Sequence, residues 1–81
     1  MRIDKYLNSV NIVKRRAISQ DMCNSGVVYI NSALAKASKD VKVGDIIEIR
    51  YIESTKKYEV LKIPEAKTIP KSKKDEYVKE I

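Results

Sequence analysis

The chain begins with a cluster of basic residues that could bind phosphate groups. Its first sixteen residues hold five bases and one acid, namely Arg2, Asp4, Lys5, Lys14, Arg15 and Arg16. This segment has a formal charge of +4 out of the +6 of the whole chain, whereas residues 17–50 are neutral. Because Lys and Arg displace the counterions condensed on phosphates, this charge distribution is typical of a nucleic-acid binder. On composition alone, a solvated charged surface explains the cluster equally well.

Residues suited to catalysis or metal binding are scarce. The chain has no histidine and a single cysteine, Cys23, so the usual Cys/His zinc site cannot be assembled. With no histidine to act as its base, Cys23 is expected to pack at or near the core rather than to act as a nucleophile. Asp4 is expected to be a helix N-terminal acid or an ion-pair partner that orients Arg15 or Arg16. The sequence therefore predicts a protein that is not an enzyme and has neither a metal nor a cofactor.

The 81 residues suffice for one small α+β domain. Helical spacing predicts a first helix over residues 3–10 and a second over about 14–24, whose inner face would be Ala17, Ile18 and Met22. Strand patterns follow at residues 27–30, 34–37, 46–51 and 58–63. Asn31 and Ser32 form the first turn, where Asn tolerates a positive φ. We expect two N-terminal helices packed on a small, mainly antiparallel sheet.

The last part of the chain has a weaker pattern. Pro64 and Pro70 bracket a segment with few periodic hydrophobic residues, so we expect an irregular linker over residues 64–71. Residues 72–81 combine a helix-start signature with an apolar stripe and could form a short helix. Such a helix is too short to be stable alone, so it docks on the body, stays frayed or orders on a partner. We therefore predict a domain over residues 1–63 followed by a linker and tail over residues 64–81.

Four short motifs, taken in order, resemble the S4 RNA-binding domain family, which is named after a small-subunit ribosomal protein. They are Arg2-Ile3-Asp4-Lys5-Tyr6-Leu7, Lys14-Arg15-Arg16-Ala17, Gly26-Val27-Val28-Tyr29-Ile30-Asn31-Ser32 and Val41-Lys42-Val43-Gly44-Asp45-Ile46-Ile47. Each motif alone is weak, but the four together span roughly residues 1–51. Ser32 stands where the family usually has glycine. The stretch from Lys36 to Val41 strengthens the resemblance to the short stand-alone members of the family, which include a ribosome-associated quality-control factor and a fifteen-kilodalton heat-shock protein.

The resemblance implies a protein that binds ribosomal RNA of the large subunit and a tRNA stranded with its nascent chain. A ribosome quality-control protein is a further candidate partner, and we expect a cytoplasmic monomer with no membrane association. The residues expected to bind RNA are Arg2, Asp4, Lys5, Lys14, Arg15, Arg16, Gln20, Asn31, Lys36 and Lys39. Asn31 is expected to be a turn residue first and an RNA contact second. Alternatives are a role in heat-shock rescue or subunit assembly and, from another class, a membrane-surface or protein-interaction module.

Overall fold

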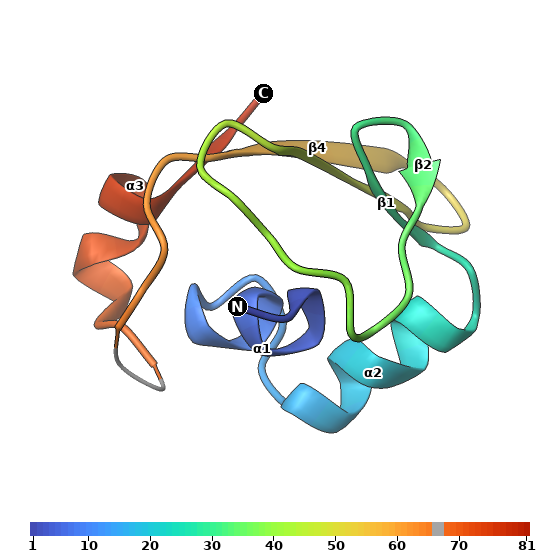
Figure 1. Ribbon diagram of the computed structural model, residues 1–81, viewed down its shortest axis with the longest axis horizontal. Helices are drawn as coiled ribbons and strands as arrows, with labels where there is room; N and C mark the ends of the chain where they lie inside the picture. The colour runs from blue at the N-terminus through green and yellow to red at the C-terminus, as the bar shows by residue number, and fades with distance from the viewer. Residues whose placement is uncertain (66–67) are drawn as a thin grey trace.

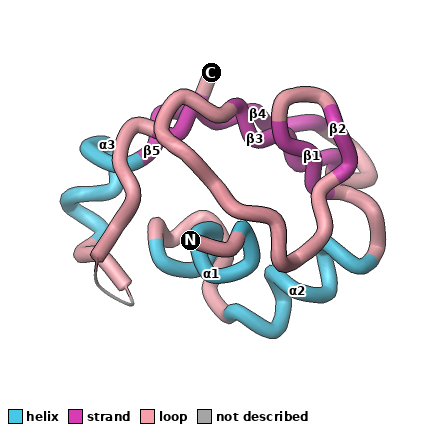
Figure 2. Tube along the Cα trace, viewed as in Figure 1, coloured by secondary structure: helices cyan, strands magenta, loops and turns pink. Residues whose placement is uncertain are grey.

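Two short helices cover one side of an antiparallel sheet in the computed structural model, which describes residues 1–65 and 68–81 (Figure 1). In chain order the elements are α1 (Ile3–Ser9), α2 (Arg16–Asn24), β1 (Val28–Ile30), β2 (Ala33–Leu34), β3 (Ile46–Arg50), β4 (Thr55–Val60), the 3-10 helix η1 (Lys71–Lys73), α3 (Lys74–Tyr77) and β5 (Val78–Glu80). Over the described residues, the strands lie in the order β2-β1-β3-β4-β5 and all neighbours are antiparallel. The predicted α+β arrangement is therefore confirmed. Figure 2 shows the strands along one side, with α1 and α2 along the other.

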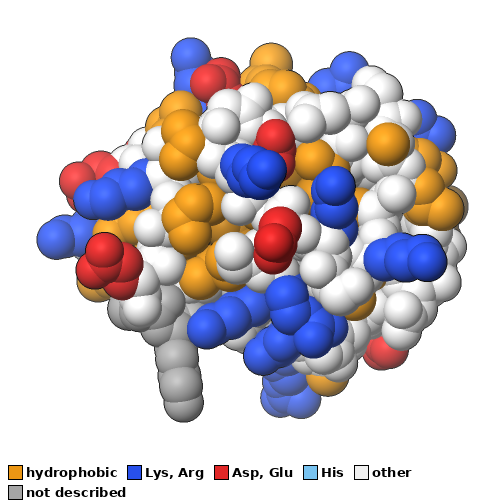
Figure 3. Space-filling model, in the orientation of Figure 1, with side chains coloured by type: hydrophobic (Ala, Val, Ile, Leu, Met, Phe, Trp, Pro, Cys, Tyr) orange, Lys and Arg blue, Asp and Glu red, His pale blue; other side chains and the backbone are white. Residues whose placement is uncertain are grey.

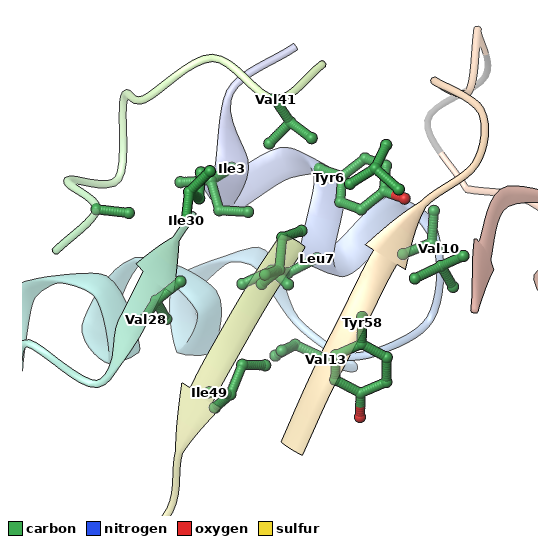
Figure 4. Packing of buried hydrophobic residues seen from close by; sticks show 14 of the residues in the cluster. Ile3, Tyr6, Leu7, Val10, Val13, Val28, Ile30, Val41, Ile49 and Tyr58 are labelled. Carbon is green, nitrogen blue, oxygen red and sulfur yellow. The ribbon is translucent and has the colours of Figure 1, made fainter. Parts of the chain in front are cut away.

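The core lies between α1 and the inner face of the sheet (Figure 4). Ile3, Tyr6 and Leu7 of α1 are fully buried and point toward the strands, where Ile47 and Ile49 of β3 are also fully buried. The alternating burial along β1 and β3 follows from the period of two in a strand, which sends successive side chains to opposite faces. The sheet thereby fixes α1, the helix that bears the basic N-terminal motif.

The second helix differs from its prediction in its start and in its buried face. It begins at Arg16, with Arg15 as N-cap in an extended conformation. Ala17 and Ile18 are exposed and Met22 is only half-buried, whereas Ser19 and Cys23 are buried. Ser19 lies inside because its hydroxyl donates a 2.7 Å hydrogen bond to the backbone carbonyl of Asp4, and a buried polar group that is paired in this way is not costly. Burial raises the pKa of the Cys23 thiol to about 11, as expected for a packed residue.

The β1–β2 hairpin has the tight turn that the sequence predicts. Asn31 and Ser32 have φ values of 50° and 70°, so both central residues are left-handed as in a type I′ turn. The family's usual glycine would adopt the Ser32 conformation without the steric cost of a side chain. Two strand boundaries were predicted wrongly: β2 ends at Leu34, because the chain then turns toward α1, and β4 runs from Thr55 to Val60 rather than from Tyr58 to Ile63.

The tail packs on the body, which is one of the three alternatives considered. The predicted tail helix is confirmed only over Lys74–Tyr77, since Val78–Glu80 form a strand that pairs with β4. The Tyr6 hydroxyl donates a hydrogen bond to the carbonyl of Tyr77 at 3.0 Å, and Val78 is 2% exposed. Within the predicted linker, Ile69 is buried, while residues 66 and 67 lie outside the described residues. The division of the chain at residue 63 stays a prediction.

Candidate nucleic-acid interface

A fully buried carboxylate, that of Asp4, organises the basic N-terminal motif. Its Oδ2 atom lies 3.1 Å from Nη2 of Arg2 and 3.6 Å from Nη2 of Arg16. The Gln20 side chain donates a further hydrogen bond to the same oxygen at 3.1 Å, and the backbone N–H of Lys5 donates to Oδ1 at 2.7 Å. Asp4 thus joins two arginines that are fourteen positions apart, and it does so from beneath the surface.

The charge state of Asp4 follows from these contacts. Burial raises the cost of ionising the carboxyl, but hydrogen bonds from Gln20 and from the Lys5 backbone oppose that effect, as do the charges of Arg16 and Arg2. The pKa of Asp4 is consequently held below its ordinary value of 3.8. At neutral pH the carboxylate is charged and attracts both guanidinium groups.

The two arginines remain available to a ligand. The Arg2 side chain is 48% exposed and the Arg16 side chain is 44% exposed, whereas Asp4 has no exposed surface. A guanidinium has five N–H donors, so one edge can face Asp4 while others face a phosphate. The predicted ion pair between Asp4 and Arg16 is present, and Arg2 is a second partner of the same carboxylate. Asp4 itself has no surface that a ligand could contact.

The other bases of the first sixteen residues lie on or beside the same two helices as this arginine pair. Lys14 and Arg15 are exposed just before and at the start of α2, and Lys5 is half-buried on α1. Lys5 and Arg16 line one hollow of about 330 Å³. Figure 3 shows Lys and Arg side chains gathered at the lower centre of the view, over α1 and the beginning of α2. The structure therefore brings together Arg2, Lys5 and Arg16, which come from both helical motifs.

Two further predicted residues, Lys36 and Lys39, lie on the loop that follows β2. Both are exposed, and the loop is tied to α1 because the Ile3 N–H donates to the carbonyl of Lys39 at 2.7 Å. Arg2 also forms an isolated β-bridge with Asp40 of this loop. Arg2 and Lys36 line a common hollow of about 460 Å³. The loop lysines thus extend the basic surface from Arg2 toward the β1–β2 hairpin.

Asn31 and Gln20 are engaged in contacts within the protein. The Asn31 amide donates to Asp45 Oδ1 at 3.1 Å and accepts from the N–H of Ile46 at 3.0 Å, so it fastens the hairpin to the turn before β3. Gln20 is half-buried and holds Asp4. Gln20 acts on the surface through Asp4, and Asn31 through the turn before β3. For Asn31, this agrees with the expectation that it is a turn residue first.

Sequence reasoning missed Ser19 as part of this assembly. Its hydrogen bond to the Asp4 carbonyl fixes α2 against α1, and so fixes Arg16 relative to Arg2. A serine in a helix usually faces solvent, so the residue type alone does not predict a buried contact. The one available signal was the position of Ser19 three residues after Arg16, which places both on the same face of the helix.

The exposed charges of this surface suit the recognition of anions. Among the described residues, no group of three or more acidic, Cys or His side chains is placed to hold a metal ion. No helix in the described part of the chain has both the length and the hydropathy needed to span a membrane. What the surface offers is a set of cations, two of which are paired with Asp4.

Comparison with known proteins identifies the family of this chain. A model of the S4 domain matches residues 1–47. The chain is 47% identical over 78 residues to the RQC P-site tRNA stabilizing factor of Helicobacter pylori, a match that covers 96% of this chain and 93% of that relative. The solution structure of the hypothetical protein HP1423 has a TM-score of 0.87 at 46% identity, covering all of this chain and 96% of the other.

A second solved structure shares the fold at lower identity. The trimeric structure of Vibrio cholerae heat shock protein 15 has a TM-score of 0.89 at 27% identity, covering all of this chain and 81% of the other. The family match spans both helices, the loop after β2 and the turn before β3, which are the segments that form the basic surface. This chain therefore belongs to the S4 domain family, with relatives that are named RQC P-site tRNA stabilizing factors.

Proposed function

We propose that this protein binds structured RNA on the large ribosomal subunit, where it contacts ribosomal RNA and a stranded peptidyl-tRNA during ribosome-associated quality control. The observation that carries the proposal is the pair of half-exposed arginines, Arg2 and Arg16, held by the buried Asp4. The names of the relatives, RQC P-site tRNA stabilizing factors, supply the setting. The proposed RNA contacts are Arg2, Arg16, Lys5, Lys14, Arg15, Lys36 and Lys39, with Asp4, Gln20 and Asn31 positioning them.

The form of the surface favours recognition of RNA shape over sequence. An A-form helix hides its base edges in a deep, narrow groove but displays phosphates and 2′-hydroxyls. Arginines with fixed orientation suit phosphate oxygens because the guanidinium donates two parallel hydrogen bonds, whereas lysines add unoriented charge. Arg2 and Arg16 would set the register on the RNA, and the surrounding lysines would add affinity.

The proposed mechanism is binding without catalysis. The protein would act in the cytoplasm as a monomer, holding the tRNA and the ribosomal RNA together while a quality-control protein acts on the nascent chain. With orientation set in advance by Asp4, less side-chain freedom is lost when the RNA binds. That is the advantage expected of a stabilising factor.

Salt dependence of binding to purified large subunits tests the electrostatic part of the proposal. About four to six phosphate contacts would give a slope of log K against log salt of roughly −3 to −5. Co-sedimentation measured over a series of salt concentrations checks this slope. A flat salt response would contradict the proposal, and binding to anionic liposomes with no binding to ribosomes would favour the membrane-surface alternative.

The role in quality control is tested by comparing the affinity for large subunits with and without a peptidyl-tRNA. Large subunits with a peptidyl-tRNA in the P site are expected to bind the protein about tenfold more tightly than empty subunits, which corresponds to about 1.4 kcal/mol. Equal affinity for the two would argue for the heat-shock rescue or assembly alternative. The same two preparations, titrated at one salt concentration, provide the measurement.

A further inference from the structure

A hollow of about 330 Å³ lies beside β2, between the β1–β2 hairpin and the loop that follows it. It has an apolar wall and two lysines, and its lining includes Ile30, Ala33, Leu34, Ala35, Lys36 and Lys39. The Leu34 side chain is 62% exposed, so a large apolar group faces solvent at the mouth of a basic hollow. Adjacent apolar and cationic groups of this kind fit a ligand that has a flat apolar face and a negative charge.

The hollow is preformed by backbone hydrogen bonds. The Ala35 N–H donates to the carbonyl of Val28 at 2.9 Å, which holds the first residue of the loop against β1. The Lys39 N–H donates to the carbonyl of Lys36 at 2.9 Å and closes the turn between the two lysines, and Ile3 anchors this turn to α1. A ligand would therefore meet a wall whose shape is set by the fold.

The hollow shares part of its lining with a second hollow that Arg2 lines. This second hollow measures about 460 Å³ and has Leu34, Ala35 and Lys36 in common with the first. Arg2 is in turn bound to Asp4. An RNA whose phosphates reach Arg2 would thus have its next nucleotides beside Lys36 and Leu34.

We infer that this hollow receives a single unpaired nucleotide of the bound RNA. The base packs on the wall that includes Leu34, and the flanking phosphates contact Lys36 and Lys39. The inference rests on the proposed function, since it names the element of the RNA that the basic surface recognises beyond its helical shape.

Size and chemistry both favour an unpaired base. Ligand pockets usually measure about 300–1,000 Å³, so a hollow of about 330 Å³ can hold one base. In a paired helix the faces of the bases are stacked and hidden, whereas bulged and loop bases are free to pack on protein side chains. Charge complementarity with the two lysines then selects a nucleotide over an uncharged apolar group.

A pair of RNA hairpins tests the inference, one fully paired and one identical except for a single bulged adenine. The unmodified protein is expected to bind the bulged hairpin about tenfold more tightly at fixed salt, because the apolar face of the base leaves water when it packs on Leu34. Leu34→Ser should abolish this preference and leave affinity for the paired hairpin unchanged. Val43→Ser is the matched control, because Val43 is 64% exposed and lies outside the lining of the hollow.

A fluorescent base provides a second measurement that needs no variant. With 2-aminopurine at the bulge, binding of the unmodified protein should change its emission as the base enters the hollow, whereas 2-aminopurine within the paired stem should respond little. Equal affinity for the two hairpins, or equal effects of Leu34→Ser and Val43→Ser, would overturn the inference. In that case, salt-dependent binding of the paired hairpin would still support the proposed function, and binding of neither hairpin would refute both.

One outcome would assign the hollow to another occupant. If Leu34→Ser keeps the preference for the bulged hairpin but loses affinity for whole large subunits, the apolar wall contacts a ribosomal protein. That result would also overturn the inference.

Discussion

Nη2 of Arg2 lies 3.1 Å from Oδ2 of Asp4, a residue two positions away whose side chain has no exposed surface. The same oxygen lies 3.6 Å from Nη2 of Arg16 on the next helix. A ligand can therefore reach the two arginines without touching the acid that aligns them. The carboxylate lowers the net charge of the site, yet it pairs with both guanidinium groups.

Replacement of Asp4 by asparagine distinguishes the effect of net charge on RNA binding from the effect of arginine orientation. Asp4→Asn raises the net charge by one, so a surface that works by charge alone would bind RNA more tightly. We expect weaker binding instead, by about 1 kcal/mol. Without the carboxylate, the two arginine side chains move more freely in the unbound protein, and this conformational entropy is lost when the RNA binds. Titration of large subunits with this variant checks the sign of the change.

Asp40→Asn is the matched control for that measurement. Asp40 is 75% exposed and its ion pair with the chain's amino group spans 3.8 Å. The substitution adds the same unit of charge beside the basic surface and leaves the arginine pair intact, so it should strengthen binding slightly. If both variants bind more tightly, Asp4 has no orienting role.

Stability in acid should also depend on Asp4. The folded-state pKa of Asp4 lies below its ordinary value of 3.8, so its contribution to stability is fully present above the unfolded pKa. That contribution is lost as the pH falls through the lower folded-state pKa. The free energy of unfolding in urea, measured from pH 7 to pH 2, should decline in this range. Asp4→Asn should be less stable at pH 7 by about 1–3 kcal/mol and should show a flatter acid decline.

Glu48→Gln serves as the comparison in the same titration. A hydrogen bond from Arg50 lowers the pKa of Glu48, which gives the same direction of pH dependence. Glu48 lies on the sheet with its partners near solvent, so the effect of its replacement on the acid decline should be the smaller of the two. The opposite order would show that Asp4 is not the main acid-sensitive group.

Removal of the Arg16 side chain should reduce binding without unfolding the protein. Arg16→Ala is expected to weaken RNA or large-subunit binding by about 1–3 kcal/mol and to change stability by at most about 0.5 kcal/mol, because Asp4 keeps Arg2, Gln20 and the Lys5 N–H as partners. The affinity of Arg16→Lys should lie between those of the unmodified protein and Arg16→Ala, since lysine keeps the charge and lacks the planar guanidinium. Anisotropy titrations together with urea unfolding measure both quantities.

Lys79→Ala provides the charge-matched control for Arg16→Ala. Lys79 is exposed on β5, in the part of the chain that the S4 domain model does not match. Its removal should leave affinity within about twofold, or 0.4 kcal/mol, of the unmodified protein. An equal loss in both variants would mean that net charge, rather than the arginine pair, determines affinity.

The sequence was sufficient for the fold class and for the basic surface, and the reasons are local. Ile3 and Leu7 have helical spacing, Ile47 and Ile49 have strand spacing, and the bases cluster within sixteen residues. Such signals depend on neighbours in the chain, which is why two helices, the first hairpin and a mainly antiparallel sheet could all be predicted.

The remaining features depend on contacts between distant segments. The buried face of α2 was predicted wrongly because a periodicity of hydrophobic residues selects Ile18, whereas the bond from Ser19 to the Asp4 carbonyl turns that polar residue inward. The burial of Asp4 likewise needs Gln20 from another helix. The strand at Val78 has only three residues and owes its form to pairing with β4, so its own sequence gives no period to detect.

Val78 provides a test of how firmly the tail belongs to the core. Its side chain is 2% exposed and it pairs with Val60 of β4, so Val78→Ala removes two buried carbon atoms and should lower the free energy of unfolding by about 1–3 kcal/mol. Ile81→Ala is the control, because Ile81 is 66% exposed and its loss should cost at most about 0.5 kcal/mol. Urea denaturation of both variants gives the comparison. If the tail is independent of residues 1–63, neither substitution changes the free energy of unfolding of the domain. If β5 belongs to one cooperative sheet, Val78→Ala lowers that free energy and the protein still unfolds in a single transition.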